Sequence, residues 1–137
     1  MTAHLPALVV VVPLLAGPLI MIARHPRAAW LLALVVSAVT FAMAAALAVT
    51  VGTHGPLHYA LGGFAPPMGI ELRVDAAATL MLVVVSFIST VVLAGAHPAV
   101  RQEIPHERTH LFYAAWMLCL AGLLGICATG DAFNLFV

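Results

Sequence analysis

The stretch GIELRVDAAATLMLVVVSFISTVVLAGAHP, residues 69–98, contains the change of pattern that decides the fold. From 70 to 75, apolar and charged residues alternate strictly, and this period of two predicts a β-strand with one charged face. From 76 to 96 the residues are almost entirely apolar, a run long enough to cross a bilayer as a helix. The sequence therefore predicts a surface strand that leads into a membrane helix. The charged face carries Glu71, Arg73 and Asp75.

The boundaries of this membrane helix are also encoded locally. Asp75 stands immediately before the apolar run, where an amino-terminal cap is expected. His97 and Pro98 follow the run, and because proline cannot continue the hydrogen-bond ladder, we expect the helix to close there.

Three further apolar runs surround this helix, at residues 5–23, 29–51 and 111–129. With 64% hydrophobic and only 7% charged residues, the chain is predicted to be an all-α membrane protein with four transmembrane helices. Basic residues follow the first run instead of preceding it, so we interpret it as a retained helix and not a secretory signal. The chain has no lysine and no net charge, which argues against nucleic-acid binding.

A second strand is predicted before the first, at residues 58–61, with Gly62-Gly63 and Pro66-Pro67 supplying the turn of a short β-hairpin between the second and third helices. The arginines orient the chain, because four lie in the turns after the first and third helices and only Arg73 lies on the other side. By the positive-inside rule those turns are cytoplasmic, so the amino terminus and the hairpin are expected to face outward. The four are Arg24, Arg27, Arg101 and Arg108.

The polar residues suggest little chemistry of their own. Every histidine lies at a predicted span end or in a loop, whereas a haem anchor needs imidazoles at mid-depth on facing helices, so neither a haem nor another cofactor is expected. The histidine-rich turn at residues 97–110 fits no zinc signature, and no metal is expected. The predicted spans contain no charged residue, and their hydroxyls are expected to bond to their own backbone or a neighbouring helix.

Asp131 is the one acidic residue for which an ion path is considered. It precedes AFNLFV, which predicts the start of a fifth helix, and its carboxylate is expected to cap that helix. The same charge would also add negative potential to an outer ion entrance, so the two roles are compatible.

Two segments resemble a known family. YALGGFAPPMGIELRVDA, residues 59–76, and TGDAFNLFV, residues 129–137, resemble the amino-terminal part of the proton-translocating antiporter-like membrane subunits. These include the D-type subunit of multisubunit Na⁺/H⁺ antiporters and related subunits of membrane-bound hydrogenases and respiratory complex I. The resemblance covers essentially the whole chain. The GD-x-FNLFV pattern favours the branch of the antiporter D-type subunits, although Ala132 stands where that branch usually has leucine.

This resemblance implies that residues 1–137 form the amino-terminal transmembrane segment of a longer subunit in a bacterial or archaeal cell membrane. The family's proton-transfer glutamate would follow just beyond Val137, and its lysines lie on later helices. The four helices are therefore expected to act as a scaffold, not as an enzyme by themselves, within a cation/proton antiporter or an oxidoreductase-like or hydrogenase complex.

The implied partners are other membrane subunits and the lipid bilayer, with protons and monovalent cations moved by the complete subunit. The alternative is a small non-catalytic membrane subunit that assembles with or anchors other proteins.

Overall fold

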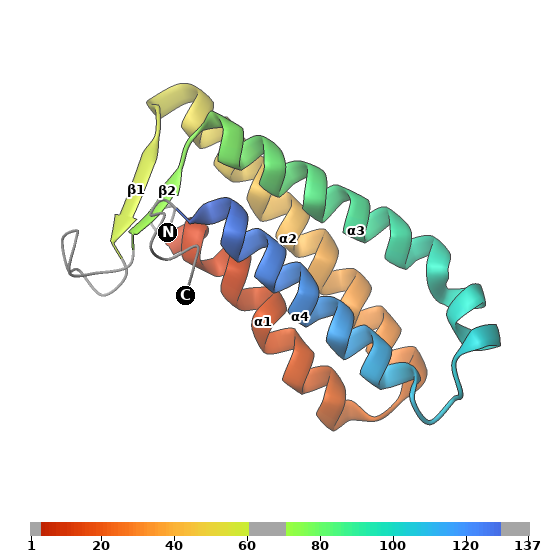
Figure 1. Ribbon diagram of the computed structural model, residues 1–137. Coiled ribbons are helices and arrows are strands. Elements are labelled where there is room, and N and C mark those ends of the chain that lie inside the picture. The colour runs from red at the N-terminus through yellow and green to blue at the C-terminus, as the bar shows by residue number, and fades with distance from the viewer. Residues whose placement is uncertain (1–3, 61–70, 130–137) are drawn as a thin grey trace.

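The computed structural model describes residues 4–60 and 71–129 and shows a bundle of membrane-type helices. The helices are α1 (Leu5–Ala23), α2 (Pro26–His54), α3 (Ala76–Glu103) and α4 (Thr109–Ala128). All 4 are long and apolar enough to cross a membrane, which confirms the four predicted spans. Figure 1 shows them side by side, with the α1–α2 and α3–α4 turns at one end of the bundle.

Proline and a left-handed residue make the sharp turn between the first two helices. Arg24 ends α1 with φ 49°, and His25 is extended. Pro26 then begins α2, a position where the missing N–H leaves no intrahelical hydrogen bond unmade. This turn brings α2 back along α1, so the helices run antiparallel.

Asp75 caps α3 as predicted. Its carboxylate accepts a hydrogen bond from the backbone N–H of Ala78 at 2.8 Å, which satisfies one of the free donors at the start of the helix.

The predicted end of α3 at His97-Pro98 is wrong, because the helix continues to Glu103 with Pro98 inside it. A proline removes only its own N–H, so a neighbouring helix is able to support the turn around it. Trp30 of α2 packs beside this part of α3. Its indole N–H donates to the Leu93 carbonyl at 2.8 Å, and its ring lies 4.4 Å from the His97 ring, centroid to centroid.

Two short strands pair antiparallel at the other end of the bundle: β1 (Leu57–Ala60) and β2 (Glu71–Val74). Leu57 lies opposite Val74 in the ladder. β1 begins one residue before the predicted strand at 58–61, and β2 lies within the predicted strand that begins at residue 70. The predicted turn lies in 61–70, outside the described residues, so a closed hairpin stays a prediction. The predicted fifth helix, in 130–137, also lies outside them.

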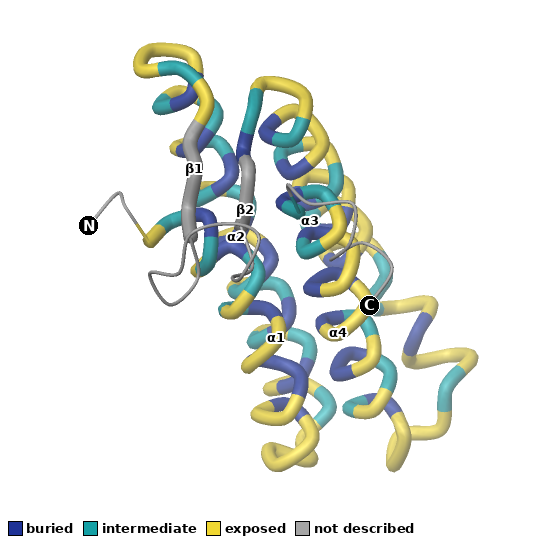
Figure 2. Tube along the Cα trace, turned by 60° about the vertical axis from the view of Figure 1, so that its left-hand side comes forward, coloured by how far each residue is buried: buried dark blue, intermediate teal, exposed yellow. Residues whose placement is uncertain are grey.

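The interior of the bundle is formed by one face of each helix. Large fully buried side chains include Ile20, Leu47, Leu82, Tyr113 and Leu124. Figure 2 shows the buried positions recurring along the inner side of each helix while exposed positions recur on the outer side.

The outer faces of the helices are apolar as well. Leu15 is 58% exposed, Ile22 77% and Val49 69%. In water such continuous apolar surface would drive association, whereas in a bilayer it contacts lipid or neighbouring helices. The chain is therefore a multi-pass membrane protein.

Candidate functional site

The interior of the bundle contains a hydrogen-bonded polar cluster made by three helices. Ser37 of α2 donates to the Ser89 hydroxyl of α3 at 3.1 Å, and its oxygen lies 3.0 Å from the Thr90 hydroxyl. Trp116 of α4 donates its indole N–H to the same Ser89 oxygen at 2.9 Å. Ser37 is fully buried and Ser89 is 5% exposed. We call Ser37, Ser89, Thr90 and Trp116 the interhelical polar cluster.

The sequence places these residues on facing sides through helical spacing. Ser86, Ser89 and Thr90 are three or four residues apart, so they share one face of α3. The α2 and α3 helices pack extensively along their length, which brings Ser37 against this face.

Other hydroxyls within the helices bond to their own backbone, as predicted. Thr40 donates to the Val36 carbonyl at 2.8 Å, and Ser86 donates to the Leu82 carbonyl at 2.6 Å. Thr90 also donates to the Ser86 carbonyl at 2.8 Å. Serine and threonine hydroxyls and an indole N–H do not ionise at ordinary pH. The interhelical polar cluster therefore ties helices together and offers no group that holds or releases a proton.

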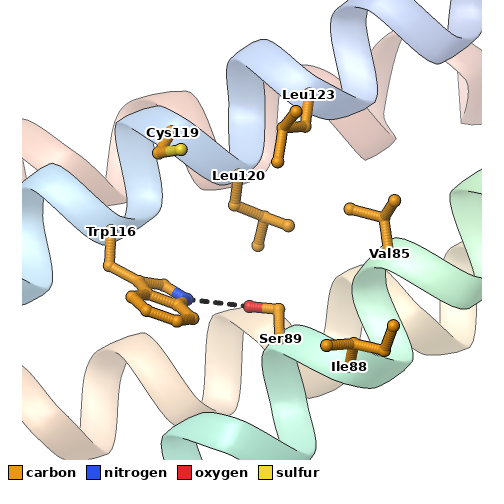
Figure 3. A pocket seen from close by; sticks show the side chains of 7 residues that line it. All are labelled: Val85, Ile88, Ser89, Trp116, Cys119, Leu120 and Leu123. Carbon is orange, nitrogen blue, oxygen red and sulfur yellow. Dashed lines mark hydrogen bonds between the residues drawn. The ribbon is translucent and has the colours of Figure 1, made fainter.

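An apolar groove lies beside the cluster, between α3 and α4 (Figure 3). Its volume is about 270 Å³. The polar atoms of Ser89 and Trp116 bond to each other across it, so its remaining surface suits only hydrocarbon. The lining residues are Val85, Ile88, Ser89, Trp116, Cys119, Leu120 and Leu123.

The residues singled out in the sequence are not brought together into one site. Asp131, the ion-path candidate, lies outside the described residues, and its role stays a prediction. Glu71 and Arg73 belong to β2, opposite Ala60 and His58, and their side chains are likewise outside the described part of the chain. Asp75 is engaged as the cap of α3. Within 4–60 and 71–129, no three His, Cys, Asp or Glu side chains lie close enough to hold a metal ion.

The role of Trp116 and the pairing of Ser37 with Ser89 were not predicted. The spacing of the hydroxyls was consistent with contacts between helices, but which helix each would face depends on how the helices are rotated about their axes. The sequence contains no local signal for that rotation.

No family model matches the chain. The N-type subunit of the NADH-quinone oxidoreductase of Desulforudis audaxviator is 41% identical over 140 residues, covering 100% of this chain and 28% of that protein. The D-type subunit of the Na⁺/H⁺ antiporter of Alkalihalophilus pseudofirmus is 37% identical over 91 residues, covering 66% of this chain and 18% of that protein. The chain thus covers only 28% of the length of the first of these relatives and 18% of the second.

A solved structure has the same arrangement of helices. It is the membrane-bound sulfane sulfur reductase, an archaeal respiratory membrane complex, one chain of which matches with a TM-score of 0.83 and 26% identity. The match covers 97% of this chain and 27% of the other. The relatives carry the names of both an oxidoreductase subunit and an antiporter subunit, so the favoured antiporter branch stays a prediction. Sequence and fold together show that the chain belongs to the family of antiporter-like membrane subunits.

Proposed function

We propose that this chain supplies scaffold helices at the amino-terminal end of a membrane subunit for cation/proton antiport or redox-coupled proton translocation. The observation that carries the proposal is the 41% identity to the N-type subunit of an NADH-quinone oxidoreductase, which extends over 100% of this chain. The complete subunit would move protons and monovalent cations, and this segment would hold its transport helices in place.

The scaffold role is supported by the distribution of charge. Charged side chains inside a membrane cost about 2.5–3.5 kcal/mol each and mark ion or proton paths. In the described parts of the chain, Arg, Asp and Glu occur only at helix ends, in strand β2 or in connections. The interiors of the four helices offer hydroxyls that are already hydrogen-bonded, an arrangement that suits packing more than transport.

The partners would be other membrane subunits and lipid. Large apolar side chains cover the outer faces of the bundle, and additional helices of the same assembly would pack there. We place the complex in a bacterial or archaeal cell membrane.

Two measurements test the proposal. In proteoliposomes with a trapped pH-sensitive dye, the chain alone should pass protons no faster than protein-free liposomes. Affinity purification of the tagged chain from its native membranes should co-purify subunits of an antiporter, hydrogenase or quinone oxidoreductase complex.

The results of these measurements separate the alternatives. Proton flux through the chain alone would contradict the scaffold role. Co-purification of membrane proteins unrelated to any transport complex would favour the non-catalytic assembly or anchor subunit instead.

A further inference from the structure

A small basic pocket lies at the end of the bundle where the two turns meet. It is formed by the α1–α2 turn and by the segment that links α3 to α4, which are about 75 residues apart in the sequence. Its volume is about 170 Å³, many times the roughly 10–15 Å³ that a cavity needs to hold one water molecule. The lining residues are His25, Pro26, Arg27, Arg101 and His106.

The side chains that line the pocket are positively charged or donate hydrogen bonds. Arg27 and Arg101 each bring a guanidinium group, which is charged at any physiological pH and suits the oxygens of a phosphate. His25 and His106 add ring nitrogens that donate hydrogen bonds in the appropriate tautomer.

The arginines of the pocket are not neutralised by neighbouring carboxylates in the described part of the chain. Glu103 and Glu107 lie near this end and are exposed, but neither lines the pocket. Among the described residues, no ion pair joins either glutamate to Arg27 or Arg101. The start of α2 adds to the positive potential, because its first turn contains no acidic residue and has no side-chain cap. The pocket therefore offers two positive charges from two segments to an anion.

The position of the pocket identifies the source of that anion. Arg27 is the second residue of α2, and Arg101 lies in the last turn of α3, so both lie at the ends of helices long and apolar enough to cross a membrane. We infer that the membrane interface lies at this depth. Phospholipid phosphates occupy this depth, and basic pockets between membrane helices bind anionic headgroups. We propose that this pocket binds the phosphate of an anionic phospholipid, with Arg27 and Arg101 as the charged contacts.

Lipid selectivity of the whole chain tests the proposal. The protein is reconstituted in phosphatidylcholine vesicles that contain spin-labelled phosphatidylglycerol or spin-labelled phosphatidylcholine, and electron paramagnetic resonance measures the fraction of label immobilised by the protein. The unmodified chain should prefer phosphatidylglycerol. The double variant Arg27→Gln/Arg101→Gln should lose this preference. The association constant for phosphatidylglycerol relative to phosphatidylcholine should fall roughly fivefold for each arginine removed.

A matched control separates the pocket from general surface charge. Arg24 and Arg108 lie at the same end of the bundle but do not line the pocket. The double variant Arg24→Gln/Arg108→Gln removes the same charge and should keep most of the preference. Arg27→Lys/Arg101→Lys should keep part of it, because lysine retains the charge without the planar fork of arginine.

Three results would overturn the assignment. The first is the absence of any preference for phosphatidylglycerol in the unmodified chain, and the second is an equal loss of preference in both glutamine double variants. The third is release of the labelled phosphatidylglycerol by millimolar inorganic phosphate at constant ionic strength. That third result would assign the pocket to a free phosphate ion. If Arg27→Gln/Arg101→Gln does not yield a monodisperse helical protein, the single variants Arg27→Gln and Arg101→Gln decide by the same comparison.

Discussion

At the scale of single residues, Ser89 lies at the centre of the interhelical polar cluster. Its oxygen accepts hydrogen bonds from α2 through Ser37 and from α4 through Trp116. In a membrane, helix association has no hydrophobic driving force between helices, so packing and interhelical hydrogen bonds contribute a larger share. One small hydroxyl therefore links three helices at a point where water does not compete.

We expect Ser89→Ala to destabilise the bundle by about 1–2 kcal/mol, since hydrogen bonds between membrane helices average about 0.6 and reach about 1.7 kcal/mol each. Thr50→Ala is the control, because the Thr50 hydroxyl is exposed and bonds only to the Ala46 carbonyl of its own helix. Unfolding in mixed micelles with increasing dodecyl sulfate measures both. Equal stability of the two variants would show that the interhelical polar cluster contributes nothing.

A double-mutant cycle adds a sharper check on the same contact. Trp116→Phe removes the indole donor and keeps an aromatic ring. If Ser89 and Trp116 act through their 2.9 Å hydrogen bond, the combined variant should lose less stability than the sum of the two single losses.

The same residues show what sequence patterns reveal at this scale. The Asp75 cap could be predicted, because capping depends only on residues within one turn of each other. The bonds from Ser37 to Ser89 and from Trp116 to Ser89 join residues 52 and 27 positions apart. They depend on the rotation of whole helices, and a hydroxyl in isolation is as well satisfied by its own backbone.

At the scale of elements, the bundle is held by close packing of α1 on α4 and of α2 on α3. Gly17 lies where α1 and α4 come close together. A Cβ placed there would lie 2.9 Å from both Cγ and Cδ2 of Leu118 and 3.5 Å from the Ala114 carbonyl oxygen. Small residues at such positions let membrane helices approach one another.

We therefore expect Gly17→Ala to destabilise the bundle. Overpacking costs about 1–3 kcal/mol, which exceeds the roughly 1 kcal/mol that alanine gains over glycine within a helix. Gly122→Ala is the matched control, since nothing lies within 4 Å of its added Cβ, and it should leave stability unchanged or raise it. The same micelle titration measures both variants.

Adding Leu118→Ala to Gly17→Ala should recover part of the loss, because it removes the side chain that the new methyl group meets. A Gly17→Ala variant as stable as the unmodified chain would mean that Leu118 moves aside without cost.

The ends of the helices show why local sequence patterns do not predict every boundary of an element. Composition and length located all four helices, since a span needs only a sufficient apolar run. Pro98 predicted the end of α3, yet the helix continues to Glu103, and Trp30 of another helix packs beside this region. A proline indicates the loss of one helical hydrogen bond, but the local sequence does not show whether neighbouring helices make that loss tolerable.

At the scale of the whole molecule, the fold places most of the arginines at one end of the bundle. The turns that carry Arg24, Arg27, Arg101 and Arg108 meet at one end of the bundle, and β2 with Arg73 lies at the other (Figure 1). Asymmetric placement of arginine in short loops is what sets membrane orientation. The helices thus place at one end the turns that the positive-inside rule predicts to be cytoplasmic, and the outward-facing amino terminus stays a prediction.

That arrangement predicts a specific labelling pattern. Thr53 lies in the last turn of α2 at the strand-bearing end, and Gln102 lies in the last turn of α3 at the arginine-rich end; both are exposed. Cysteines are introduced one at a time by Thr53→Cys and Gln102→Cys after Cys119 and Cys127 have been replaced by alanine. In intact cells an impermeant maleimide should label the Thr53→Cys variant and not the Gln102→Cys variant, because positive loops remain in the cytoplasm.

Permeabilised cells, in which both should react, are the control. Outside labelling at position 102 alone would reverse the orientation, and it would also place the basic pocket of Arg27 and Arg101 against the outer leaflet.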